Sequence, residues 1–83
     1  MEKRAIILVG QLRDAAQSAL DYIEGLTKED FLTDRRTCDA VALNLLVTGE
    51  IAAKLVRDFP TLIDDNPHIP WEAMRGMRNR IAH

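Results

Sequence analysis

The sequence of 83 residues is poor in cysteine, in long apolar runs and in aromatic side chains. Its one cysteine, Cys38, excludes a disulfide framework and a thiolate metal cage within the chain, since both need several sulfur atoms. The early apolar run at residues 5–9 is too short for a signal sequence or a membrane-spanning helix. We therefore expect a reduced, cytoplasmic protein without a membrane partner.

A large excess of charge of one sign is also absent. The formal net charge is −2, which argues against a protein that coats DNA or RNA through a broad basic surface. A local basic site fits this balance, because Arg75, Arg78 and Arg80 gather within residues 71–83 against a single acid, Glu72. Any anion site should therefore lie in the last segment.

Size and composition set further bounds. Aromatic residues make up 5% and apolar residues 47%, so a folded core must be built mainly from aliphatic side chains. With 83 residues the chain allows one domain, spanning residues 1–83, near the lower size limit for folding alone. We expect that oligomerisation adds to the buried surface.

Apolar spacing of three and four residues predicts two long helices. The first covers residues 3–24 and ends at Gly25, and the second covers residues 34–59 and ends before Pro60. Between them, the sequence T-K-E-D at residues 27–30 resembles a capping box and opens a short turn or helix. The predicted core stripes are Ile6, Val9, Leu12, Ala16, Ala19, Leu20 and Ile23 in the first helix, and Val41, Leu45, Thr48, Ala52, Leu55 and Phe59 in the second.

The three prolines of the chain lie within residues 60–70, which we interpret as a loop. Pro70 suits the first turn of a third helix, because its missing N–H has no helical partner there. The apolar stripe of this helix is Trp71, Met74, Met77 and Ile81. Since no strand period is present, we predict an all-α, antiparallel helical bundle with three visible helices and one helix short of a complete bundle.

A projection of the third helix at about 100° per residue divides its polar residues into two groups. Arg78 falls within the apolar stripe, whereas Arg75, Asn79 and His83 share a flank beside it. An inward arginine needs an anion, and Glu50 on the second helix is the internal candidate. Two interpretations stay open: Arg78 and Glu50 form a buried ion pair, or Arg78 lines a cleft that binds a phosphate.

The end of the sequence carries the strongest functional signal. Arg78, Asn79 and His83 have the spacing R-N-x-x-x-H, and an arginine fork beside a proton-exchanging imidazole suits phosphate chemistry. The longer string W-x-x-M-R-G-M-R-N-x-x-x-H at residues 71–83, together with G-E-I-A at residues 49–52, is far more specific. This pattern resembles the HepT-like branch of the HEPN superfamily over most of the chain.

The resemblance implies a HEPN-like helical bundle that acts as a homodimeric endoribonuclease toxin and is neutralised by a nucleotidyltransferase-type antitoxin. By position, Arg78 and His83 match the catalytic arginine and histidine of the family, and Asn79 matches the polar residue after the arginine. Glu50 matches an acidic position of the second helix, and Arg75 is a supporting candidate on the polar flank. RNA supplies its own nucleophile, the 2′-OH, so the implied cleavage needs no metal or cofactor.

The sequence departs from the family after His83, where relatives usually continue with a glycine, a tyrosine and another helix. We therefore expect an apolar groove that a second chain covers, or a fragment of a longer protein. Two alternatives to the enzyme stay open. The chain is a non-catalytic relative that only binds the nucleotidyltransferase partner, or it is a structural bundle in which Arg78 is an internal counter-ion.

Overall fold

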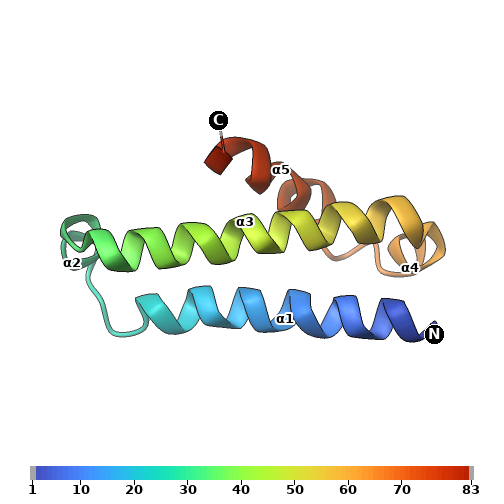
Figure 1. The fold of residues 1–83 in the computed structure, drawn as a ribbon, viewed down its shortest axis with the longest axis horizontal. Coiled ribbons are helices and arrows are strands. Elements are labelled where there is room, and N and C mark those ends of the chain that lie inside the picture. The colour runs from blue at the N-terminus through green and yellow to red at the C-terminus, as the bar shows by residue number, and fades with distance from the viewer. Residues whose placement is uncertain (1, 83) are drawn as a thin grey trace.

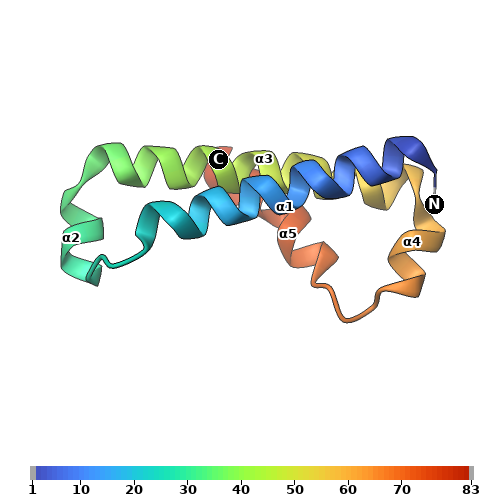
Figure 2. The ribbon, with the colours of Figure 1, turned by 90° about the horizontal axis from the view of Figure 1, so that it is seen from below.

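The computed structural model describes residues 2–82, and this part of the chain is all-α, with five helices and no strand. The helices are α1 (Lys3–Ile23), α2 (Lys28–Thr33), α3 (Arg35–Asp58), α4 (Pro60–Asp65) and α5 (Trp71–Ala82). The long helices α1 and α3 lie side by side and antiparallel, and α5 lies against the other side of α3 (Figure 1). The short helices α2 and α4 project from opposite ends of this layer toward the same side (Figure 2).

The ends of the helices follow from local sequence. Gly25 adopts a positive φ of 77° just after α1, a conformation that glycine enters without steric cost. The Thr27 hydroxyl accepts a hydrogen bond from the Asp30 N–H at 3.0 Å and caps α2. Asp34 caps α3 by accepting from the Thr37 N–H at 3.2 Å. The predicted bounds of the two long helices are therefore confirmed to within a residue.

The interpretation of residues 60–70 as a loop is wrong at its start, because α4 occupies Pro60–Asp65. Pro60 ends α3, since it offers no N–H to continue the helix, but its fixed φ also suits the first position of a new one. The count of three helices was therefore too low by two short helices, α2 and α4. The sequence signal of α2 is the cap at Thr27, whereas Pro60, the signal of α4, was interpreted only as the end of α3.

The predicted core stripe of α1 is only partly right: Leu12 and Ala19 are buried and Val9 packs against the core, but Ile6, Leu20 and Ile23 are exposed. The buried residues of α1 are Ala5, Leu8, Leu12, Ala15 and Ala19. By contrast, Ile6 and Leu20 are 56% and 58% exposed. The apolar side of α1 is wider than the strip that α3 covers. Helix α3 packs on the part that is rich in alanine, where small side chains let two helices approach closely.

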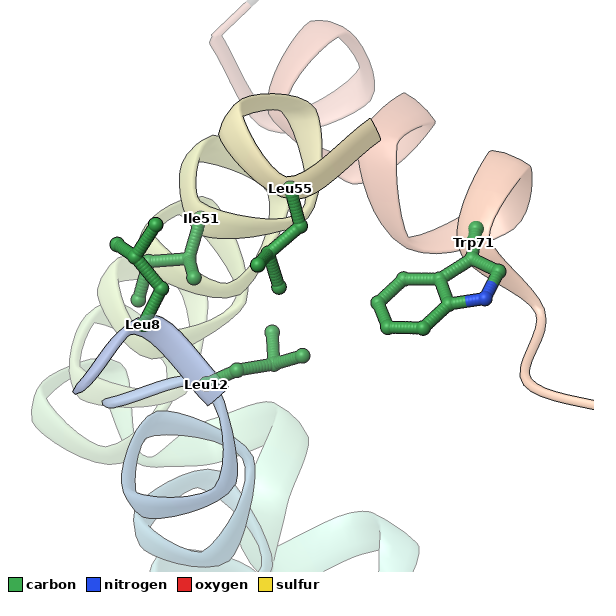
Figure 3. Packing of buried hydrophobic residues seen from close by; sticks show 5 residues of the cluster. All are labelled: Leu8, Leu12, Ile51, Leu55 and Trp71. Atoms are coloured by element: carbon green, nitrogen blue, oxygen red, sulfur yellow. The ribbon is translucent and has the colours of Figure 1, made fainter. Parts of the chain in front are cut away.

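The central core joins α1, α3 and the first residue of α5 (Figure 3). Its buried residues are Leu8, Leu12, Ile51, Leu55 and Trp71, and Leu55 has no exposed surface. The Trp71 indole Nε1 donates to the Asn66 carbonyl oxygen at 3.0 Å, so this polar atom is satisfied inside the core. Trp71 thereby anchors the start of α5 against both long helices.

The predicted stripes of α3 and α5 fit the structure better than that of α1. Thr48, Ala52 and Leu55 are buried on α3 as expected. Along α5, exposure increases away from Trp71: Met74 and Met77 are half-buried, and Ile81 is exposed, against the prediction. None of the helices in the described range is long and apolar enough to cross a membrane.

Candidate functional site

The candidate site lies where α5 crosses α3, and a glycine permits that crossing. A Cβ atom placed on Gly49 would lie 2.8 Å from the Arg78 backbone nitrogen and 3.0 Å from the Met74 carbonyl oxygen. Both neighbours are backbone atoms, which cannot rotate out of the way as a side chain can. Gly49 therefore sets the distance between the two helices at the turn of α5 that carries Arg78.

Arg78 lies on the side of α5 that faces α3, as the helical projection predicted. Its Nη1 atom is 3.5 Å from Oε2 of Glu50, so the predicted pairing is confirmed. The pair is not buried, however, because the Arg78 and Glu50 side chains are 43% and 47% exposed. The backbone of Arg78 contacts α3 while its long side chain extends to the surface, so the interpretation as a buried ion pair is wrong.

The exposure of this pair matters for chemistry. An ion pair in contact with water is weak and exchanges partners easily, whereas a buried pair would hold Arg78 in place. Glu50 therefore orients the guanidinium without preventing it from meeting another anion. Arg78 combines a fixed backbone position with an accessible charged group.

The polar flank of α5 lies next to Arg78. Arg75 and Asn79 are exposed and line, with Arg78, a hollow of about 500 Å³ between α3 and α5. Arg75 donates a hydrogen bond to Glu72, one turn earlier on the same helix. His83, the proposed catalytic histidine, lies outside the described residues, so its place beside this hollow stays a prediction.

The structure adds one residue that sequence reasoning missed. Arg57, near the end of α3, lines the same hollow as Arg75 and Arg78. Its Nε donates to Asp58 Oδ1 at 2.9 Å, and Asp58 also accepts from Arg4 of α1 at 2.8 Å. Nothing in the local sequence distinguishes Arg57 from other exposed arginines, because only the crossing of α5 over α3 places it there.

Two hydrogen-bonded arginines change the acidity of Asp58. The bonds from Arg57 and then Arg4 lower the pKa of Asp58 from its ordinary value of 3.8 to about 2. The same contact with Asp58 raises the pKa of Arg57. Asp58 therefore stays ionised down to low pH and joins the start of α1 to the end of α3.

The described part of the site offers permanent positive charge and hydrogen-bond donors. Such groups bind anions and stabilise charge that develops on a phosphoryl group. Within residues 2–82, no three or more His, Cys, Asp or Glu side chains gather in a way that could hold a metal ion.

Comparison with known proteins identifies the family. The chain is 38% identical over 76 residues to a protein of Thermococcus cleftensis named probable ribonuclease HepT, a match that covers 87% of this chain and 66% of that protein. It is 34% identical over 64 residues to a protein of Methanocaldococcus jannaschii that is provisionally named an RNase, covering 77% of this chain and 50% of the relative. The chain thus spans about half to two thirds of the length of these relatives.

No solved structure matches the chain significantly. The model of the family described as Ribonuclease HepT-like matches residues 12–83. The match includes α3, α5 and the residues of the arginine-lined hollow. Because it extends over most of the sequence, the chain belongs to the Ribonuclease HepT-like family.

Proposed function

We propose that the protein is a metal-independent endoribonuclease that cleaves RNA at a site formed by Arg78 and His83. The observation that carries the proposal is the geometry of Arg78. Its backbone is held against Gly49, and its guanidinium reaches the surface beside Glu50 at the edge of a hollow rich in arginine. The ribonuclease names of the relatives support the same reading.

The reaction that suits these residues is an internal transesterification. The 2′ oxygen of the RNA attacks the adjacent phosphorus as its proton passes to a base, and the bond to the 5′ oxygen breaks as that oxygen receives a proton from an acid. The products are a 2′,3′-cyclic phosphate and a 5′-OH. His83 can act in either role, because imidazole gains and loses protons near neutral pH.

Arg78 stabilises the charge that builds on the non-bridging phosphoryl oxygens in the transition state. Before RNA binds, Glu50 holds the guanidinium at 3.5 Å, and the substrate phosphate then replaces this carboxylate. Asn79, on the next position of α5, orients the imidazole or binds a phosphate oxygen. Arg75 adds positive charge on the same flank.

We also propose that the protein acts as a homodimer and as the toxin of a cytoplasmic toxin–antitoxin pair, with a nucleotidyltransferase-type protein as the antitoxin. Exposed apolar side chains support the dimer, because surfaces of this kind commonly lie at protein contacts. The large apolar residues that are exposed in the single chain are Ile6, Ile7, Leu20, Tyr22, Ile23, Leu26, Leu32, Leu43, Val47 and Ile81.

The proposal is tested with the protein in its full natural length and a single-stranded oligoribonucleotide, in the presence of EDTA. We expect cleavage to a cyclic phosphate product, with Arg78→Ala and His83→Ala lowering the rate by about 10²–10⁴-fold. His68→Ala is the matched control, because His68 is exposed in the loop before α5 and should leave the rate unchanged.

Circular dichroism establishes that each variant is folded. Equal rates in the wild type and in both site variants would show that any cleavage comes from elsewhere. An inert wild type that still binds the nucleotidyltransferase tightly would favour the non-catalytic alternative.

A further inference from the structure

The hollows on the described surface differ in the charge of their linings. The hollow between α3 and α5 is lined by three arginines, Arg57, Arg75 and Arg78, against one acid, Glu72. By contrast, the lining of the hollow between α1 and α4 contains three acids, Glu2, Asp58 and Asp65, and no arginine or lysine. Each of the three arginines pairs with a carboxylate of Asp58, Glu72 or Glu50 while its own side chain stays at least partly exposed, so the arginine-lined hollow can take up an anion by exchange of partners.

The shape of the hollow leaves room for more than the scissile phosphate. Arg57 comes from α3, and Arg75 and Arg78 come from α5, so the cations stand on two walls. Ala53 and Gly76 also line the hollow, and neither carries a side chain larger than a methyl group. The volume of about 500 Å³ is in the range of small-molecule sites and exceeds what one phosphate group needs.

Arg57 and Arg75 are held in place but remain available to a ligand. Arg57 donates to Asp58 at 2.9 Å, and Arg75 donates to Glu72. Both arginines are exposed, and exposed ion pairs exchange one anion for another at little cost. The carboxylates thus orient the guanidinium groups while an RNA phosphate can still replace them.

We propose that Arg57 and Arg75 bind the phosphate next to the scissile one, so that the hollow is a second-phosphate subsite for single-stranded RNA. This inference rests on the proposed function, which places the scissile phosphate at Arg78. The substrate class that follows is an RNA with at least one phosphate beyond the cleaved bond. This subsite recognises the sugar–phosphate backbone of the RNA and not its base sequence.

The test compares two substrates with the protein in its full natural length. One is a ribodinucleoside monophosphate, which has only the scissile phosphate, and the other is a hexaribonucleotide without terminal phosphates. We expect Arg57→Gln to lower kcat/KM about fivefold more for the hexamer than for the dinucleotide. Arg78→Ala should lower both rates severely, because both substrates contain the scissile phosphate.

Binding of the hexamer gives an independent readout. Arg57→Gln should reduce the slope of log Kd against log salt by about 0.7, the value for one phosphate contact on a single strand. Glu72→Gln should have the opposite effect and lower the Kd of the hexamer, since it removes a competing carboxylate from Arg75. Asp58 also pairs with Arg4 at 2.8 Å, so we expect the Arg57→Gln variant to keep this contact and to fold.

The control is Arg35→Gln, which makes the same change of charge at the other end of α3. Arg35 is exposed and lies 3.9 Å from Asp39, outside the hollow. If Arg57→Gln lowers the two rates equally, or changes hexamer binding no more than Arg35→Gln does, the second subsite is refuted. If the wild type cleaves neither substrate, the proposed function fails, and hexamer binding and its salt slope still decide the subsite.

Discussion

Helix α3 contacts α1 and α5, its two main neighbours, through interfaces of different chemistry. Toward α1 it presents an aliphatic stripe that packs on leucine and alanine of α1, so this contact is mainly apolar, with one ion pair between Arg4 and Asp58 at its end. Toward α5, the closest approach is backbone to backbone at Gly49, and the margin carries Glu50, Arg57 and Arg78. One helix thus serves as a core element on one side and as the wall of a charged hollow on the other.

The difference shows how a small chain can separate stability from a candidate site. The α1–α3 contact stabilises the fold in proportion to the apolar area that it buries. The α3–α5 contact holds charged groups at a set spacing, and Trp71 anchors one end of α5 in the shared core. We expect mutations in the first interface to change mainly stability and those in the second to change mainly activity.

The largest expected effect on stability comes from the apolar interface. Leu55→Ala should lower the free energy of unfolding by about 2–5 kcal/mol, because Leu55 has no exposed surface and its truncation leaves a cavity. Urea denaturation measures the loss. The control is Leu32→Ala on α2, where the leucine is exposed and the change should stay within about 0.5 kcal/mol. Similar losses in the two variants would contradict the assignment of the core.

The next prediction tests the crossing at Gly49. Gly49→Ala should cost about 1–3 kcal/mol, since the new Cβ would overlap the Arg78 backbone. The displacement of α5 should also lower RNA cleavage by on the order of 10²-fold, because the guanidinium moves away from the reacting phosphate. Denaturation and cleavage rates are measured on the same samples.

Gly10→Ala is the matched control for this crossing. Gly10 lies within α1, and an added Cβ there would meet no atom within 4 Å. This variant should be as stable as the wild type or up to about 1 kcal/mol more stable, because alanine favours a helix over glycine. The role of Gly49 is wrong if both glycine variants retain full cleavage.

A smaller effect separates an exposed ion pair from a buried one. Glu50→Gln should change the free energy of unfolding by no more than about 1 kcal/mol, because Glu50 and Arg78 are both accessible to water. Thermal or urea unfolding measures the change. A loss of about 3–5 kcal/mol would instead indicate a desolvated pair and a mainly structural Arg78.

The smallest effect appears only in acid. Asp58 has a pKa of about 2 in the fold and an ordinary value of 3.8, so it stabilises the folded state above pH 4 and loses this contribution as the pH falls toward 2. Asp58→Asn should therefore flatten the acid limb of stability against pH, as followed by circular dichroism. Asp14→Asn, at an exposed site on α1, is the control, and an equal flattening there would contradict the special role of Asp58.

Local sequence determined the three longer helices of this protein and most helix ends. Caps at Thr27 and Asp34, a glycine after α1, Pro60 as the first residue of α4 and Pro70 before α5 act within a few residues, so their effects can be predicted without the fold. The pairing of Arg78 with Glu50 was also predictable, because an inward arginine needs an anion and few acids lie on the facing helix. The string at residues 71–83 also identified the family without the fold, because its residues are contiguous in the sequence.

Tertiary structure alone decided which side of α1 is buried, how exposed Arg78 is and that Arg57 joins the hollow. The apolar side of α1 is wider than the strip that one neighbouring helix can cover, so the sequence does not specify which part packs on α3. A helical projection places Arg78 on a face of α5, but it does not give how far the long side chain extends. Gly49, inside a long helix, is a sign of close approach between helices, but from the sequence we used it only as part of the G-E-I-A pattern. The spacing between helices depends on contacts between segments far apart in the chain, and spacing along the sequence does not contain that information.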